Sequence, residues 1–179
     1  MRNIIIRTIA ISSLALFTLS SSNEIEKMNF QYYTRSHNIS LPKDKKIVLV
    51  GGCFDILHSG HIQLLEKAKQ TGNCLVVALE PDERISRYKN RTPTHTQQER
   101  AHNLLALRAV DHVILLPLLH GFDDYLELVK IINPDVIAVT SNDPQMTNKQ
   151  KQADTIGAQL IIVNDRIENL SSSAISQQK

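Results

Sequence analysis

Residues 47–61 of the chain read IVLVGGCFDILHSGH, and this stretch contains the change from strand to helix that decides the fold. Its first four residues are all apolar, which is typical of a strand buried on both faces of a parallel sheet. After two glycines and the motif, Ile62, Leu65 and Ala68 follow at the spacing of one helix face, and Gly72 is placed to end that helix. The stretch therefore predicts the first strand–helix unit of an α/β domain.

The same alternation of apolar strands and amphipathic helices continues along the chain. We expect further buried strands at residues 74–79, 113–116, 136–139 and 160–163, and helices at residues 97–108, 125–132 and 148–155. The pattern predicts an α/β fold, a Rossmann-like open parallel sheet of about five strands with helices on both faces. Ligands of such sheets bind at the carboxyl ends of the strands.

The first 45 residues differ in composition from the rest. Residues 1–23 contain Arg2 and Arg7 but no acidic residue, and a short apolar stretch precedes three serines. This pattern is typical of a secretory or organelle leader, and the stretch is too short for a stable membrane span of about 20 apolar residues. An over-extended start, with initiation at Met28, is the alternative. We expect a leader-like segment at 1–27, a polar arm or linker at 28–45 and one domain at 46–179.

The composition argues against several classes of protein. Lys plus Arg number 20 and Asp plus Glu number 18, so the formal charge of +2 does not indicate a nucleic-acid binder. Cys53 and Cys74 are too few for a disulfide framework or a four-cysteine zinc site. The sequence also lacks the glycine patterns of dinucleotide-binding and P-loop proteins and the serine-hydrolase elbow. A phosphate site in this chain must therefore be built in another way.

Two histidines at the expected start of the first helix offer such a site. His58 and His61 lie three residues apart and can project from one helix face. A helix N-terminus carries free N–H groups and partial positive charge, and Gly60 lets an anion approach the backbone closely. The segment predicts a phosphate site in which imidazoles donate to oxygens that gain charge during a reaction. The alternative is a structural histidine pair or part of a zinc site, for which the sequence offers no clear third ligand.

The motif Gly52-Cys53-Phe54-Asp55, followed by His58-Ser59-Gly60-His61, resembles the signature of the cytidylyltransferase-like nucleotidyltransferases. This family includes glycerol-3-phosphate cytidylyltransferase and the heptose-phosphate adenylyltransferases. The resemblance covers about residues 46–175. Its other parts are a basic loop after the second strand, a proline followed by an arginine-bearing helix, the stretch at 109–113 and the segment RIENLSSS at 166–173.

The resemblance implies that the enzyme joins CTP or ATP to a small phosphorylated acceptor, with release of pyrophosphate and with Mg²⁺. No metal ligand is assigned, and the family tends towards homodimers. Exposed ion pairs for the basic residues and a helix cap for the serines are the open alternatives. The residues with implied catalytic roles are His58, His61, Lys89 and Arg166, and those with implied nucleotide contacts are Gly52, Cys53, Phe54, Asp55, Gly60, Arg91, Arg100, Ser171 and Ser172.

The acceptor is less well defined by the sequence. Asp143 is the candidate acceptor-binding residue, because family members carry an acidic residue after the fourth strand, but Pro144 and Asn169 depart from the family pattern. Our first interpretation is a cytidylyltransferase that acts on a polyol or sugar phosphate. An adenylyltransferase that acts on heptose phosphate or FMN is the alternative, and a non-catalytic nucleotide-binding module is the third. The need for a nucleoside triphosphate favours the cytoplasm, which conflicts with the leader-like segment.

Overall fold

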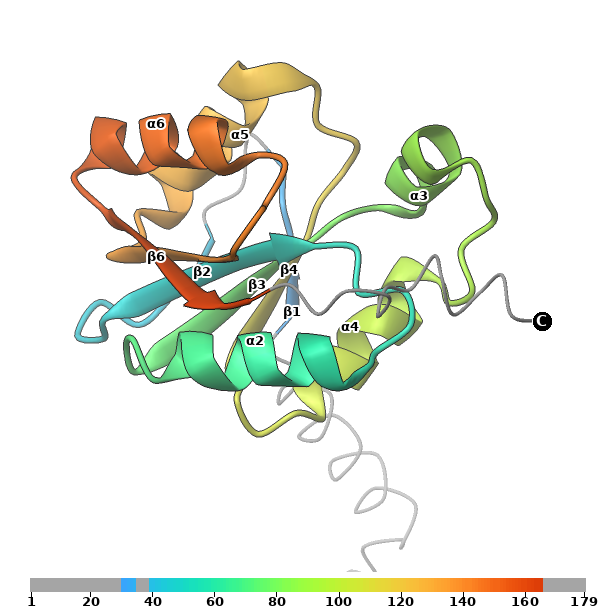
Figure 1. Cartoon of the computed structure of the whole chain (residues 1–179), viewed down its shortest axis with the longest axis horizontal. Coiled ribbons are helices and arrows are strands. Elements are labelled where there is room, and N and C mark those ends of the chain that lie inside the picture. Colours follow the sequence, from blue (N-terminus) through green and yellow to red (C-terminus); the bar gives the residue numbers. More distant parts are fainter. Residues whose placement is uncertain (1–29, 35–38, 166–179) are drawn as a thin grey trace, which may run out of the picture.

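The computed structural model describes residues 30–34 and 39–165, which build one parallel sheet with helices on both faces (Figure 1). The sheet has six strands in the order β1-β4-β3-β2-β5-β6. The strands are β1 (Phe30–Tyr32), β2 (Ile47–Gly52), β3 (Cys74–Leu79), β4 (His112–Leu115), β5 (Val136–Thr140) and β6 (Gln159–Asn164). The helices are α2 (Ser59–Lys69), α3 (Asp82–Lys89), α4 (Gln97–Leu105), α5 (Gly121–Ile132) and α6 (Met146–Ile156).

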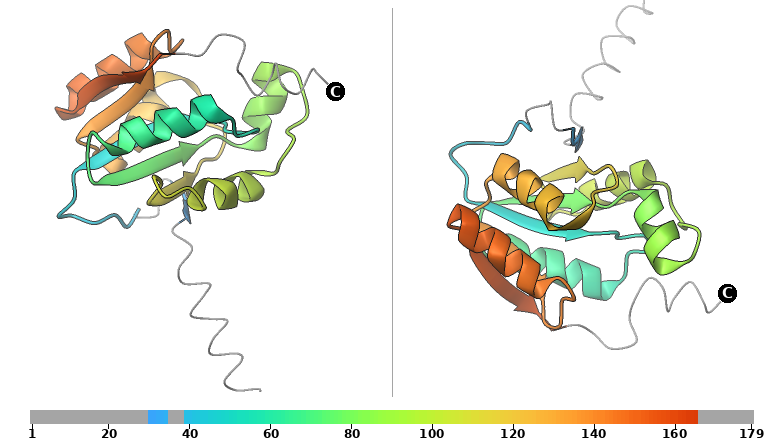
Figure 2. Two further views of the ribbon diagram at one scale, coloured as in Figure 1. Left: turned by 60° about the horizontal axis from the view of Figure 1, so that its bottom comes forward. Right: turned by 90° about the horizontal axis from the view of Figure 1, so that it is seen from above.

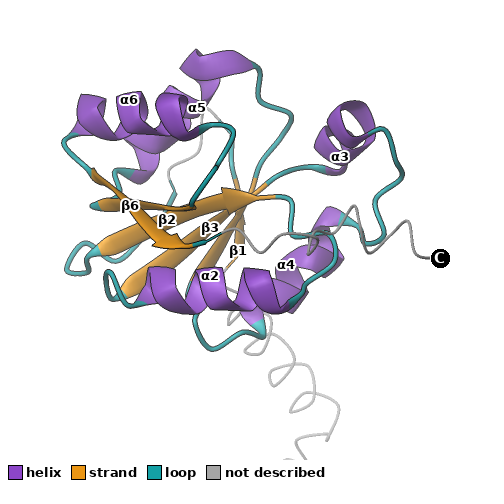
Figure 3. Cartoon of the chain, viewed as in Figure 1, coloured by secondary structure: helices purple, strands orange, loops and turns teal. Residues whose placement is uncertain are grey.

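The continuous apolar run of β2 is explained by two hydrophobic cores. Successive side chains of a strand point to opposite faces, so Val48 and Val50 pack in the core beneath α2 and α4. Ile47 and Leu49 pack in the other core, beneath α5 and α6. Figures 2 and 3 show these helix pairs on opposite sides of the strands. Both faces of the central strands are therefore buried beneath helices.

The order of the strands creates a crevice at the carboxyl end of β2. From β2 the chain proceeds to β3 and β4 on one side, and then crosses to β5 and β6 on the other. Loops that leave neighbouring strands in opposite directions open such a crevice, where ligands of this fold class bind. The topology brings residues 51–53 and 140–145, which are far apart in the sequence, to this one place.

The predicted fold class and its five strands are confirmed, with boundaries that differ by one or two residues. The sheet has one strand more than the five located from the sequence, because Phe30–Tyr32 pairs with β4 as a sixth, edge strand. Its successor Tyr33 is buried and donates its backbone N–H to the carbonyl of Leu115 at 2.9 Å. Part of segment 28–45, expected to be a polar arm or linker, thus belongs to the sheet. Three residues are too few to produce a detectable strand pattern.

A second correction concerns the basic segment after β3, which was expected to be a loop. Asp82–Lys89 forms α3, with Asp82 and Glu83 in its first turn and Arg87 and Lys89 in its last. Charges in these positions interact favourably with the helix dipole and so stabilise the helix. The pattern of apolar residues could not reveal this helix, because Ile85 is its one buried residue.

The leader-like segment at 1–27 lies outside the described residues, so that prediction is not tested. Within 30–34 and 39–165, no helix is both long and apolar enough to cross a bilayer. Arg166, Ser171 and Ser172 also lie outside the described residues.

Candidate functional site

The turn after β2 holds the motif in an unusual backbone conformation. Phe54 has a positive φ of 47°, which is rare for a bulky residue and marks a constrained turn. Its buried ring lies over Gly52, where an added Cβ would be 2.8 Å from Phe54 Cε2. The same ring lies 5.0 Å from the ring of His61, centroid to centroid. Gly52 and Phe54 thus fix the turn that leads into α2.

His58 and His61 form a stacked pair at the start of α2. Their ring centroids are 3.7 Å apart, and the ring planes differ by 23°. Both ring nitrogens of His58, and Nδ1 of His61, are buried and have no hydrogen-bond partner among the described residues. Buried polar atoms are nearly always hydrogen-bonded in folded proteins. The unpaired nitrogens therefore indicate that this pair binds a ligand.

Both imidazoles are held in the neutral form. Burial, together with the neighbouring His58 ring, lowers the pKa of His61 from 6.5 to about 4. Burial also lowers the pKa of His58. A neutral imidazole has one N–H donor and one acceptor nitrogen. Both nitrogens of His58 lack partners among the described residues, so its N–H is available to a ligand. The N–H of His61 bonds the backbone of Ile56, so its Nδ1 donates only when the ring takes up a second proton, which a bound anion favours.

The lowered pKa of His61 predicts a dependence of stability on pH. Between pH 6.5 and about 4 the unfolded chain binds a proton at His61 that the folded chain does not bind, so the folded state loses stability as the pH falls. The loss is complete below the folded pKa. We expect the free energy of unfolding, from urea titrations, to fall more steeply over this range in the wild type than in His61→Gln. Parallel pH profiles would contradict this prediction.

Asp55 holds the motif to the loop that follows α3. Its carboxylate is 1% exposed and accepts the backbone N–H groups of Thr94 at 2.9 Å and of His95 at 3.1 Å. It also forms an ion pair with Arg91. Burial alone would raise the pKa of Asp55, but the hydrogen bonds from Arg91 and from the backbone of His95 and Thr94 hold it below its usual value. The role of Asp55 in the structure is to anchor this loop.

Arg100, predicted to contact the nucleotide, bonds to protein groups in the structure. Its side chain is buried, and its guanidinium donates to the carbonyls of Cys53, Glu80 at 3.0 Å and His95 at 3.2 Å. It also pairs with Asp82 at 2.6 Å. These partners lie at the ends of β2 and β3, at the start of α3 and in the loop before α4. Arg100 therefore holds these loops together.

Two pockets meet at the carboxyl end of β2. The first, of about 610 Å³, contains the stacked histidines and is called the histidine pocket here. The second, of about 520 Å³, lies towards α5 and is called the Glu80 pocket. Both volumes are typical of pockets for small ligands. The rim that the two pockets share is formed by Gly51, Gly52, Cys53, Tyr88, Lys89, Asp143, Pro144 and Lys149.

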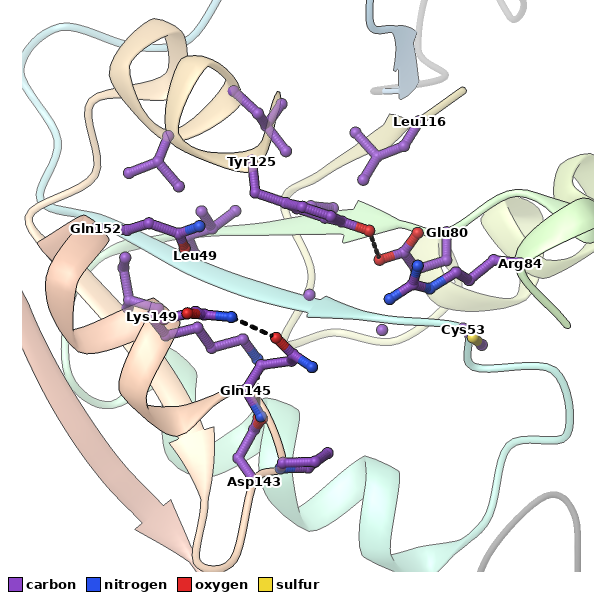
Figure 4. Close-up of a pocket in the computed structure, with 18 of the residues that line it drawn as sticks. Leu49, Cys53, Glu80, Arg84, Leu116, Tyr125, Asp143, Gln145, Lys149 and Gln152 are labelled. Carbon is purple, nitrogen blue, oxygen red and sulfur yellow. Dashed lines mark hydrogen bonds and ion pairs between the residues drawn. The ribbon is translucent and has the colours of Figure 1, made fainter. Parts of the chain in front are cut away.

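Polar side chains converge in the Glu80 pocket, which Figure 4 shows in close-up. The hydroxyl of Tyr125 donates to Glu80 Oε1 at 2.8 Å. Arg84 lies beside Glu80 in Figure 4 and also stacks on the ring of Tyr88, with its Cζ 4.1 Å from the centroid. Lys149, from α6, pairs with Asp143 at 2.8 Å. The pocket thus contains two carboxylates, each with a basic side chain beside it: Arg84 beside Glu80, and Lys149 beside Asp143.

The structure brings together many of the residues singled out from the sequence. The histidine pocket is lined by Gly52, Cys53, Phe54, His58, Gly60, His61, Lys89 and Asp143. Asp55, Arg91 and Arg100 do not line either pocket. Sequence reasoning missed Glu80, Arg84, Tyr125 and Lys149. Of these, Glu80 could have been found, because it directly follows the second strand at its carboxyl end.

The expected Mg²⁺ has no evident set of protein ligands in the part of the chain that is described. No group of three or more His, Cys, Asp or Glu side chains there could hold a metal ion. Asp55 is committed to Arg91 and two N–H groups, and Asp143 to Lys149. The described side chains therefore do not fit a protein-held metal, and no chemical step is assigned to one.

Comparison with known proteins gives a consistent family. Residues 49–178 match the family described as Cytidylyltransferase-like. The bifunctional protein HldE of Wolinella succinogenes is 40% identical over 120 residues, which are 65% of this chain and 22% of that protein. FAD synthase of Thermococcus kodakarensis is 50% identical over 99 residues, which are 54% of this chain and 64% of that protein. The chain thus spans less than two thirds of these relatives.

Solved structures with the same fold include a lipopolysaccharide core biosynthesis protein from Thermoplasma volcanium. It superposes with a TM-score of 0.55 at 28% identity, over 68% of this chain and 97% of that one. Pantoate-β-alanine ligase from Francisella tularensis has a TM-score of 0.58 at 19% identity, over 81% of this chain and 69% of that one. The second likeness concerns the fold alone.

Proposed function

The chain belongs to the cytidylyltransferase-like family, and from this premise we propose that it is a nucleotidyltransferase that joins a nucleoside triphosphate to a small phosphorylated acceptor. The observation that carries the proposal is the stacked pair of histidines that lines the histidine pocket, in which both nitrogens of His58 and Nδ1 of His61 are buried without partners among the described residues. Such preorganised donors suit a phosphate group that gains negative charge as it reacts.

In the proposed reaction an oxygen of the acceptor phosphate attacks the α-phosphorus of the nucleotide. A new P–O bond forms there, the bond to the β-phosphate breaks, and pyrophosphate leaves with the electron pair. His58 donates a hydrogen bond to an α-phosphate oxygen, and His61 donates through Nδ1 once the bound phosphate anion favours its protonated form. Lys89, on the rim shared by both pockets, attracts the phosphates of both substrates. The acceptor phosphate is already a nucleophile, so the protein contributes mainly position and charge stabilisation.

We propose ATP rather than CTP as the nucleotide. The likeness to FAD synthase supports this choice, because the product named there contains an adenosine group. Several HldE proteins, at 35–42% identity, form a second group of relatives that supports the choice of ATP. The first interpretation from the sequence, a CTP-dependent enzyme, becomes the alternative. Mg²⁺ would accompany the triphosphate, and we expect the reaction to occur in the cytoplasm, where nucleoside triphosphates are made.

The test is pyrophosphate release by the full chain with Mg²⁺. ATP and CTP are each combined with FMN, a heptose 1-phosphate and glycerol 3-phosphate. We expect release that requires both ATP and one of these acceptors, with CTP at least tenfold less effective. Faster release with CTP would reverse the nucleotide assignment, and release from no combination would argue for a non-catalytic module.

A further inference from the structure

A buried carboxylate oxygen in the Glu80 pocket is unused by the described residues. Glu80 Oε1 accepts the hydroxyl of Tyr125, whereas Oε2 is buried and has no hydrogen-bond partner there. Leaving a buried acceptor unsatisfied is costly, more so when it is charged. The proposed phosphate chemistry, which takes place at the histidines, does not use Glu80. The free oxygen therefore needs another explanation.

The surroundings of Glu80 define what can bind to it. Burial and the adjacent carboxylate raise the pKa of Tyr125, so its phenol remains a donor and keeps Oε1 occupied. Burial also raises the pKa of Glu80, while the bond from Tyr125 and the charges of Arg84, Lys149 and Arg100 act in the opposite direction. An anionic ligand group has no hydrogen to donate to this oxygen and is repelled by Glu80 when Glu80 is ionised. A hydroxyl or N–H group would instead supply the missing hydrogen bond.

The shape of the Glu80 pocket indicates the size of the ligand. Its volume of about 520 Å³ lies within the range of ~300–1,000 Å³ that encloses drug-sized ligands. Apolar side chains of Leu116, Phe122, Leu128 and Ile137 contribute to its wall. A three-carbon polyol would leave most of this space empty, and it has no apolar face for these side chains. A ring-shaped ligand fills the space better.

The arrangement of the two pockets also determines how a ligand is oriented when it binds. Lys89 and Lys149 lie on the shared rim, next to the histidine pocket, whereas Glu80 lies in the Glu80 pocket away from the histidines. Two lysines at the rim attract an anionic group, and the unpartnered acceptor of Glu80 suits a neutral donor, so together they orient a ligand that has an anionic end and a neutral end. The anionic end is then held at the rim, where the proposed reaction takes place.

We propose that Glu80 determines acceptor specificity by accepting a hydrogen bond from a neutral hydroxyl or ring N–H of a ring-bodied phosphate monoester. The phosphate of this acceptor lies at the rim between Lys89 and Lys149. The inference rests on the proposed function, because it identifies this ligand as the acceptor of the reaction. Binding of the ligand is nevertheless measured separately, in an experiment that needs no turnover.

Calorimetric binding to the full chain tests the proposal with three probes: FMN, a heptose 1-phosphate and glycerol 3-phosphate. We expect at least one of the two ring-bodied probes to bind at least tenfold more tightly than glycerol 3-phosphate. Comparing FMN with the heptose 1-phosphate then shows which kind of ring the pocket prefers. Glu80→Gln keeps the size of the side chain but removes its charge, and is expected to weaken that binding about tenfold or more. Glu83→Gln removes an exposed carboxylate from α3 and is expected to bind like the wild type.

Equal binding by Glu80→Gln and the wild type would overturn the inference, as would preferred binding of glycerol 3-phosphate or binding of none of the probes. Pyrophosphate release is measured in parallel. Binding that Glu80→Gln weakens, without pyrophosphate release, supports the role of Glu80 and contradicts the proposed function. Where turnover occurs, Glu80→Gln is expected to raise KM for the acceptor and to leave KM for ATP unchanged. Turnover with an unchanged acceptor KM overturns the role of Glu80 alone.

Discussion

Replacing His61 with Ala is expected to lower kcat for pyrophosphate release by about 10²- to 10³-fold, the usual effect of removing one preorganised donor from a transition state. The ring of His61 stacks on His58 and on Phe54, and its Nδ1 faces no protein partner in the described structure. Alanine removes the donor and also the surface that keeps His58 in place. His58→Ala is expected to have an effect of the same order.

The double variant distinguishes a working pair from two independent groups. Because the rings support each other, we expect His58→Ala/His61→Ala to lose less activity than the product of the single effects. Gln63→Ala, on the exposed side of α2, is the matched control and should retain wild-type kcat. Rates are measured by coupled pyrophosphate detection at saturating substrates. A His61→Ala variant with wild-type kcat would remove the histidines from the proposed mechanism.

Replacing Asp55 with Ala is expected to destabilise the fold by about 3–5 kcal/mol, the cost of breaking a buried ion pair from one side. Arg91 would be left without its partner, and the N–H groups of Thr94 and His95 would lose their acceptor. These residues belong to the loop that connects α3, which carries Lys89, to α4. Activity should therefore fall together with stability.

Urea denaturation measures the effect of Asp55→Ala. Asp44→Ala serves as the control, because Asp44 is an exposed aspartate just before β2, and its substitution should change the free energy of unfolding by less than about 0.5 kcal/mol. A loss of under 1 kcal/mol for Asp55→Ala would show that the Asp55–Arg91 pair contributes little to holding the motif.

The sequence predicted the parts of this fold whose signal is local. Val48 and Val50 are apolar because they face one core, as Ile47 and Leu49 face the other, so the run reads directly as a buried strand. The strand β1 could not be predicted, since its three residues gain their place only by pairing with β4, about 80 positions away. Tertiary contact, not local preference, determines such an element.

The same distinction applies to the site. His58 and His61 were found because they occur in one motif beside a strand end. Tyr125 lies in the helix expected at residues 125–132, and its hydroxyl gains its role from Glu80, which is 45 positions away. Lys149 reaches the rim because α6 follows β5 at the crevice. The protein partners of Arg100 could not be predicted, because they come from loops that only the fold brings together.

The most direct test of the account is the fate of labelled phosphate. The full chain is incubated with Mg²⁺, the acceptor found by the binding experiment, and ATP labelled in either the α- or the γ-phosphate. Attack at the α-phosphorus predicts that the α-label enters the acceptor product and the γ-label leaves as pyrophosphate. Transfer of the γ-label to the acceptor, or its release as inorganic phosphate with no labelled pyrophosphate formed, would contradict nucleotidyl transfer.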